Sequence, residues 1–264
     1  MRRSTLFVGQ LLFTLLVCAF MLVPVLMSLL AGLTRNYFQG ISSGLTFAWL
    51  VQVWQAYSPT VWLSLELAVA CALCVCVVGI PAAYALVRLN NRFSRAFEEL
   101  MVLPVAMPGL ASALALLLTY GQFGGFRGSW LFILVGHVLF TLPFLVRPVM
   151  AVMQRQHLPV LEEAAASLGA GPIRRFFSVV LPNCRAGILA GVLMVVTLSL
   201  GEFNLTWMLH TPMTKTLPVG LADSYASARL EVASAYTLIF LLMIVPLLIA
   251  LQAIGSRLSR GEKR

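Results

Sequence analysis

The stretch LEEAAASLGAGPIRRFFSVVLP, residues 161–182, is a polar loop between two long apolar segments. Glu162 and Glu163 precede three alanines, which are strong helix formers. Acidic side chains in the first turn of a helix are stabilised by the positive end of its dipole. We therefore expect a short helix that runs to about Leu168.

The second half of this loop begins with glycine and proline. Gly169 and Gly171 permit a sharp turn, and Pro172 cannot continue the first helix but can begin another. Residues 173–180 are predicted to form a second short helix that ends at Leu181-Pro182. The loop is thus expected to be a helix-turn-helix projection.

The composition indicates a membrane protein. Of the 264 residues, 60% are hydrophobic and 10% are charged, whereas about 25% are charged in soluble domains. The net charge of +9 comes from basic residues at the ends of apolar segments rather than on one soluble face. This distribution favours membrane orientation over nucleic-acid binding.

Chemical motifs for catalysis or metal binding are absent from the sequence. Five cysteines are present, and Cys71, Cys74 and Cys76 lie together in an apolar segment, where cysteine usually acts as a small hydrophobe. A phosphate-binding G-x-x-x-x-G-K-[ST] loop is missing, and neither Lys215 nor Lys263 follows a glycine. If the chain pumps a substrate with ATP, a partner must therefore bind the ATP, and no metal or cofactor is expected in this chain.

Six stretches are long and apolar enough, or nearly so, to span a bilayer. They are residues 6–31, 61–87, 100–118, 130–153, 186–209 and 236–255. Residues 34–60 are predicted to be an external connection at the membrane surface, because they are polar and aromatic. Pro104 and Pro108 predict an irregular start for the third span, which makes it a candidate cavity wall.

Polar residues within the spans are candidates for a substrate pathway. Glu202, with Asn204 close by, lies roughly 24 Å along its span from Ala186. Glu202 is expected either to line an outward cavity or to reach the membrane surface, and the sequence does not separate these alternatives. Glu66 is expected at the interface, and His137 as a hydrogen-bonded contact between helices.

The sequence also predicts where two helices pack closely and which side of the membrane the loops face. Gly187 and Gly191 have the spacing that lets two membrane helices approach closely. With the N-terminus inside, 13 of the 18 basic residues are cytoplasmic, as the positive-inside rule expects. Both termini and the loop at residues 161–182 are therefore predicted to be cytoplasmic.

Three patterns resemble those of ABC-importer permeases. Glu163-Ala164-Ala165, three residues, Gly169, nine residues, an aliphatic residue, one residue and Leu181-Pro182 resemble the EAA loop of that family. The family usually has Ile where this chain has Val179. The segment GIPAAYALVR, residues 79–88, and the segment LPVAMPG, residues 103–109, are also similar to patterns of the family.

The resemblance implies an all-α membrane protein with the type I ABC importer permease fold, six transmembrane helices and a cytoplasmic coupling helix. Residues 1–60 would hold the first helix and the external connection, and residues 61–258 the permease core. Within the core, residues 154–185 would form the coupling loop, and residues 259–264 a basic tail. Coupling to the ATPase would fall to the loop residues of the motif, which are Glu163, Ala164, Ala165, Gly169, Leu181 and Pro182.

The resemblance also implies partners and a mechanism. The chain would work in the bacterial inner membrane with a cytoplasmic ABC ATPase, a second permease subunit and an extracytoplasmic substrate-binding protein. Alternating access would carry the substrate past Glu202 and Asn204. The segment SLGEFNLTWML, residues 199–209, is similar to polyamine, phosphonate, thiamine and ferric-ion permeases, which suggests an aminoalkylphosphonate or a polyamine as substrate.

Two alternatives from other classes stay open at this point. A proton-driven secondary transporter could use His137, Glu66 and Glu202, and a stand-alone channel would also explain six spans with positive ends inside. Both leave the spacing from Glu163 to Pro182 unexplained. The sequence does not say whether the second permease is identical or homologous to this chain.

Overall fold

The computed structural model describes residues 2–155 and 158–260, and it is helical almost throughout. Among these residues the only β-pairing is an isolated bridge between Thr34 and Leu45. The chain forms two compact units, residues 1–58 with 220–243 and residues 59–219 with 244–264. Lys263 and Arg264 of the predicted basic tail lie outside the described residues.

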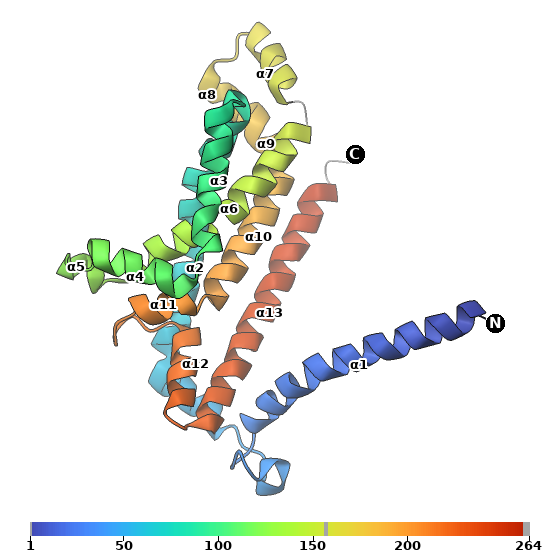
Figure 1. The fold of residues 1–264 in the computed structure, drawn as a ribbon, viewed down its shortest axis with the longest axis vertical. Coiled ribbons are helices and arrows are strands. Elements are labelled where there is room, and N and C mark those ends of the chain that lie inside the picture. The colour runs from blue at the N-terminus through green and yellow to red at the C-terminus, as the bar shows by residue number, and fades with distance from the viewer. Residues whose placement is uncertain (1, 156–157, 261–264) are drawn as a thin grey trace. The chain divides into compact units, whose positions relative to one another are not determined.

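The helices, labelled in Figure 1, are named here in chain order. They are α1 (Arg2–Ala31), η1 (Gly40–Ser43), α2 (Ala48–Leu89), α3 (Arg92–Ala106), α4 (Gly109–Tyr120), α5 (Gly124–Arg127), α6 (Trp130–Arg155), α7 (Leu158–Ser167), α8 (Pro172–Arg175), η2 (Phe176–Val180), α9 (Leu181–Asn183), α10 (Arg185–Gly201), α11 (Asn204–Leu209), α12 (Leu217–Ala226) and α13 (Leu230–Arg260).

The first unit ties the connection after α1 to the start of α13. The Glu231 carboxylate accepts a hydrogen bond from the backbone N–H of Tyr37 at 2.8 Å, and Gly32 packs against the backbone of Ser234. The Trp49 indole donates to the Thr34 carbonyl at 2.9 Å. These bonds satisfy polar groups of an irregular segment.

The helix of the second predicted span begins earlier than expected and includes the second half of the predicted connection at residues 34–60. Helix α2 already begins at Ala48 and continues without interruption to Leu89. The reason is tertiary, because Val53 of this segment is fully buried and Trp49 is held by its indole hydrogen bond. Aromatic residues that suggest a membrane-surface segment here belong to a packed helix.

In the second unit α6 and α10 lie side by side along their length (Figure 1). A methyl group at Gly191 would lie 2.8 Å from the Leu145 Cα, and one at Gly187 would lie 2.7 Å from the Pro148 carbonyl oxygen. Distances under about 3 Å leave no room for a side chain. The predicted close approach at these two glycines is confirmed.

The third predicted span is broken into two helices, α3 and α4, at an angle of 102°. Met107 is extended, with φ −83° and ψ 143°, because Pro108 disfavours a helical conformation in the residue before it. The α4 helix then starts after Pro108. An irregular start was expected here, but a bend of this size was not.

The fifth predicted span, residues 186–209, is also not one helix. Helix α10 ends at Gly201, Glu202 is extended with φ −70° and ψ 121°, and α11 begins at Asn204. The break is stabilised by the Glu202 side chain, which binds the first turn of α11. The hydrogen bonds between the Glu202 side chain and α11 therefore favour a break in the helix, although the predicted span is apolar overall.

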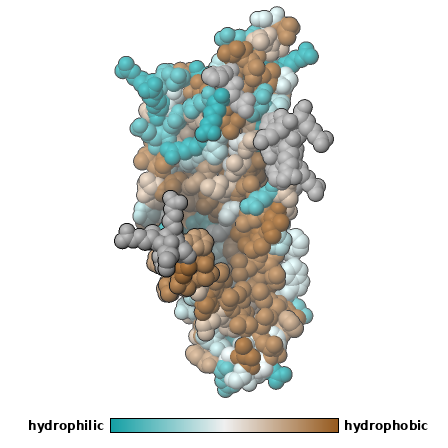
Figure 2. All heavy atoms as spheres, turned by 90° about the vertical axis from the view of Figure 1, so that its right-hand side faces the viewer, coloured by the Kyte–Doolittle hydropathy of each residue, from teal (hydrophilic) through white to brown (hydrophobic). Residues whose placement is uncertain are grey.

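Within residues 2–155 and 158–260, length and composition give four helices able to cross a membrane, or up to six if each bent pair counts as one span. The second bent pair joins residues 172–183 to α10 at 72°. Residues 7–31 of α1 are strongly apolar, and their most apolar window has no buried residue. Figure 2 shows extensive brown, apolar side chains on the molecular surface, as expected for a chain whose solvent is lipid.

Candidate functional site: the loop between α6 and α10 and the cavity beside α11

The loop at residues 161–182 folds into the predicted pair of short helices. The first, α7, ends at Ser167, close to the expected Leu168. The second is longer than expected, because helical structure continues from Pro172 through Leu181-Pro182 to Asn183. Pro182 does not end it, since a proline in the first turn of a helix sacrifices no hydrogen bond.

Gly169 makes the turn between the two helices. Its φ of +84° is in the left-handed region, where residues with a Cβ are strained. The Gly169 N–H donates to the Ala166 carbonyl at 2.9 Å and the Ala170 N–H to the Ala165 carbonyl at 3.0 Å. This pair of bonds is the Schellman motif that closes a helix, so glycine is required for the turn itself.

Open space surrounds this glycine. A methyl group at Gly169 would meet no atom within 4 Å. The requirement for glycine in the isolated chain therefore comes from the backbone alone. A partner that approaches the loop here would find room against the backbone.

Apolar side chains project from the loop. Leu168 is 88% exposed, and Ile173 and Phe177 are also exposed. We call these three residues the loop patch. Figure 2 shows apolar atoms among teal, polar ones at the end of the molecule that carries α7 and α8. Exposed apolar groups with a polar rim are typical of protein interfaces.

The two glutamates of the loop have opposite environments. Glu163 and Ala164 are exposed, and Ala165, the second alanine of the motif, is half-buried. Glu162 is 2% exposed, and one of its oxygens lies 3.5 Å from an Arg88 guanidinium nitrogen. Sequence reasoning missed the role of Glu162, although its spacing of four from the buried Leu158 places both on one face of α7.

The last two residues of the motif, Leu181 and Pro182, lie in α9 at the end of the second helical segment of the loop. Leu181 is half-buried and Pro182 is exposed. The preceding segment, Phe176–Val180, is one turn of π-helix, a rare form that recurs at functional sites. Val180 within it is buried and anchors the turn.

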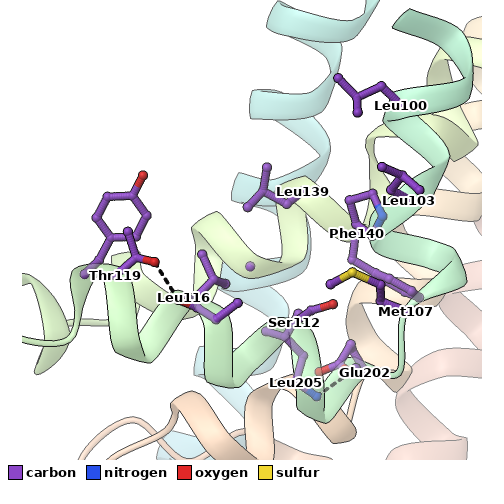
Figure 3. Close-up of a pocket in the computed structure, with 15 residues that line it drawn as sticks. Leu100, Leu103, Met107, Ser112, Leu116, Thr119, Leu139, Phe140, Glu202 and Leu205 are labelled. Carbon is purple, nitrogen blue, oxygen red and sulfur yellow. Dashed lines mark hydrogen bonds between the residues drawn. The ribbon is translucent and has the colours of Figure 1, made fainter. Parts of the chain in front are cut away.

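A cavity of about 420 Å³ lies beside the bend between α3 and α4. Its walls come from α3, α4, α6 and α11, and Figure 3 shows Leu103, Met107, Leu139 and Phe140 around it. The lining is mainly apolar, with Ser112, Thr119, Tyr120 and Glu202 as its polar members. The predicted cavity wall at the third span is thus present.

Glu202 lines this cavity and is largely buried. Its side chain is 8% exposed. One carboxylate oxygen accepts the Leu205 N–H at 2.8 Å, and the other accepts the Thr206 N–H at 2.8 Å and the Thr206 hydroxyl at 2.7 Å. The first turn of a helix has free N–H groups, and Glu202 satisfies two of them in α11 (Figure 3).

Asn204 is placed differently from Glu202. It is exposed and is not among the residues that line the cavity. Its Cβ lies beside Gly109, where an added methyl group would come within 3.1 Å. The structure therefore does not bring Asn204 and Glu202 together around the cavity.

His137 joins three helices behind Glu202. It is 1% exposed, and its Nδ1 and Nε2 lie 2.8 Å from the hydroxyls of Ser199 and Thr206. Because Thr206 donates its hydroxyl proton to Glu202, the Nε2 of a neutral His137 donates to Thr206 and its Nδ1 accepts from Ser199. The prediction of a hydrogen-bonded helix contact is confirmed.

Glu66 is exposed, but because α2 begins at Ala48 it lies well inside this helix and not close to its start, where it was expected. Among the described residues there is no cluster of three or more His, Cys, Asp or Glu side chains that could hold a metal ion. Cys71 is buried, with its sulfur 3.2 Å from the Thr141 hydroxyl.

Comparison with known proteins identifies the family to which the chain belongs. Residues 76–260 match the family described as "binding-protein-dependent transport system inner membrane component". This match covers more than half of the chain and includes the loop between α6 and α10, the bent helices and the cavity. The chain belongs to this family, the inner-membrane, multi-pass permeases of type I ABC importers.

Several curated permeases are similar to the chain. It is 29% identical to the sulfate permease CysW of Synechocystis, over 69% of this chain and 70% of CysW. It is 29% identical to the putrescine permease PotI of Escherichia coli K12, over 76% and 74%. It is 25% identical to the putative 2-aminoethylphosphonate permease PhnV of Salmonella typhimurium, over 95% and 94%.

A solved structure agrees with the fold. A chain of a bacterial ABC transporter that imports alginate superposes with a TM-score of 0.73, at 14% identity, over 97% of this chain and 96% of that one. Proteins of this family are transport subunits. Membership implies an ATPase and a substrate-binding protein as partners, and it favours the importer over a proton-driven transporter or a stand-alone channel.

Proposed function

We propose that residues 158–183 are the surface to which a cytoplasmic ABC ATPase binds. The observation that carries this proposal is the left-handed Gly169, in open space between two short helices that expose the loop patch. Glu163 and Ala164 are exposed on the first helix, Ala165 is half-buried beside them, and Leu181 and Pro182 lie in the last turn of the second. ATP is bound by the partner.

The orientation of the chain follows from the same proposal. An ATPase in the cytoplasm requires the loop to be cytoplasmic, and the distribution of basic residues independently predicts this side. Both termini would then be cytoplasmic.

The cavity beside α11 is proposed as one wall of the substrate pathway. It borders two helix breaks, and unwound segments in membrane proteins occur where they are buried or line a cavity. A second permease subunit, identical or homologous, would supply the opposite wall. Glu202 shapes this wall by fixing the start of α11, and Asn204 contacts α4 from outside the cavity.

The proposed substrate is a small amine-bearing solute, an aminoalkylphosphonate or a polyamine. PhnV supports this assignment because the similarity extends over nearly the whole of both chains, and PotI supports it as well. The Glu202 carboxylate does not, since three donors from this chain already occupy it. Selection of the amine is therefore assigned to the binding protein.

The proposal is tested by purifying the tagged chain from its native membrane in mild detergent and identifying bound proteins by mass spectrometry. An ATPase should accompany the wild type. Gly169→Val should lose it, because a β-branched residue is strained at positive φ. Gly169→Asn is the matched control, since asparagine tolerates this conformation and should retain the ATPase unless the partner contacts the Cα directly.

Purification of the chain without any ATPase, under conditions that preserve other membrane complexes, would overturn the assignment. The substrate is tested separately, by uptake into proteoliposomes with the accompanying binding protein. We expect 2-aminoethylphosphonate or putrescine to compete for uptake and sulfate or molybdate not to compete. Competition by the anions alone would reject the amine-bearing substrate.

A further inference from the structure

Two segments that the sequence presents separately meet in the structure. The cytoplasmic-side end of the GIPAAYALVR segment, on α2, carries Tyr84 and Arg88, and the loop carries Glu162 on α7. A guanidinium nitrogen of Arg88 lies 3.5 Å from a carboxylate oxygen of Glu162 and donates to the Tyr84 hydroxyl at 2.9 Å. All three side chains line one small cavity.

The burial of the two charges is unequal. Glu162 is 2% exposed, whereas the Arg88 side chain is 50% exposed. A carboxylate taken out of water is costly unless it is paired. The positive charge of Arg88 therefore offsets part of the cost of burying the Glu162 carboxylate of α7.

The pairing of Glu162 is incomplete. Its second carboxylate oxygen is buried and has no hydrogen-bond partner among the described residues. Arginine and a carboxylate can form two parallel hydrogen bonds, but here only one oxygen is near the guanidinium. A small movement of α7 relative to α2 would therefore change the strength of this pair.

A second contact joins the same helix to the other half of the loop. The rings of Tyr84 and Phe176 pack edge to face, with centroids 5.4 Å apart. Phe176 begins the π-helical turn. The end of α2 thus contacts the first helix of the loop through a charge pair and the second through an aromatic pair.

The helix α2 also reaches the cavity wall. At Gly79, α2 approaches α6 so closely that an added methyl group would lie 2.9 Å from the Leu145 side chain. Helix α6 contributes Leu139 and Phe140 to the cavity. Packed helices transmit displacement because protein interiors are dense, so a movement of α2 reaches the proposed pathway.

We propose that the Arg88–Glu162 pair transmits movement of the loop to α2 and, through α2, to α6. Arg88 and Glu162 are positioning residues that act through these helices. This inference rests on the proposed function, because it requires an ATPase that moves the loop. It adds a specific contact inside the permease, because Glu162 lies within the segment proposed to bind the ATPase but is itself buried.

The lead variant is Glu162→Gln, which keeps the shape of the side chain and leaves Arg88 half exposed to solvent. It is measured in the complex of permease and ATPase, reconstituted in proteoliposomes with the binding protein. We expect the ATPase to co-purify and the melting temperature to change little. Transport per ATP hydrolysed should fall about fivefold, within the range produced by mutations in coupled networks.

Arg88→Gln should be more harmful, because it leaves Glu162 buried and unpaired. In the double variant Arg88→Gln with Glu162→Gln this additional loss should disappear, which marks a direct interaction. Arg92→Gln is the matched control, an exposed arginine at the start of the next helix. It should leave transport per ATP unchanged.

Unchanged transport per ATP in Glu162→Gln would overturn the inference. A loss of transport that is fully explained by loss of bound ATPase would also overturn the inference, because the pair would then only shape the surface to which the ATPase binds. Absence of an ATPase from the wild-type preparation would instead reject the proposed function. The two failures are therefore distinguishable.

Discussion

Glu202 and Thr206 are joined by two hydrogen bonds to a single carboxylate oxygen, from the Thr206 N–H at 2.8 Å and from its hydroxyl at 2.7 Å. The intramembrane carboxylate that suggested a substrate contact is thus occupied by its own chain. The Glu202 carboxylate stabilises the break at which α10 ends and α11 begins. The cavity beside it owes its shape to this break.

Replacement of Glu202 should therefore affect the helix break. We expect Glu202→Ala to lower the free energy of unfolding by about 1–2 kcal/mol, because capping bonds contribute about this much. Glu202→Gln retains an acceptor and should alter transport without changing assembly. Thermal unfolding in detergent and uptake in proteoliposomes measure the two effects.

Asn204→Ala is the control for this prediction, because Asn204 is exposed. Its unfolding temperature should stay close to that of the wild type. If Glu202→Gln has wild-type transport kinetics, the carboxylate has no part in the pathway.

The imidazole of His137 is expected to hold α6, α10 and α11 together. His137→Leu removes one hydrogen bond from each of the buried hydroxyls of Ser199 and Thr206, although Thr206 still donates to Glu202. This should cost about 1–3 kcal/mol of stability, measured by thermal unfolding. His210→Leu, at a half-buried histidine that directly follows α11, should cost clearly less.

His137 also offers a test of the proton-driven alternative. Uptake by the wild-type complex should continue when a protonophore collapses the proton gradient at constant ATP. Uptake that stops under this condition, and that His137→Leu abolishes, would contradict an ATP-driven importer.

The contact between α6 and α10 depends on the small size of Gly191. In Gly191→Ala the new methyl group would lie 2.8 Å from the Leu145 Cα, so the helices must separate. Overpacking of this kind costs about 1–3 kcal/mol. We expect a clear fall in the unfolding temperature.

Gly201→Ala is the matched variant within the same helix, since a methyl group there meets no atom within 4 Å. It should leave stability unchanged or raise it slightly. Equal destabilisation by the two variants would mean that helix propensity, rather than the contact with α6, decides the outcome.

The loop patch should contribute directly to ATPase binding. Leu168→Asp places a charge at an 88% exposed apolar position, and we expect the dissociation constant for the ATPase to rise about tenfold or more, as at interface hot spots. Binding of purified ATPase to the permease in nanodiscs measures this. Met213→Asp, at another highly exposed apolar residue, is the control, and an equal loss there would indicate a nonspecific effect.

The sequence by itself determined the features that rest on local chemistry. The alanine run predicted α7, and Gly169 predicted the turn, because only glycine adopts a left-handed backbone without strain. The spacing of Gly187 and Gly191 predicted a close helix contact because side-chain size alone permits or forbids it. These signals lie within a few residues of one another.

Only the tertiary structure decided the features that depend on distant partners. An apolar run does not reveal that α10 stops at Gly201, since the break is stabilised by three hydrogen bonds to Glu202 and by the contact with His137 behind it. Two adjacent glutamates read alike in sequence, yet α7 turns Glu162 inward to Arg88 and leaves Glu163 exposed. Residues 88 and 162 are far apart in the chain, so the fold alone brings their charges together.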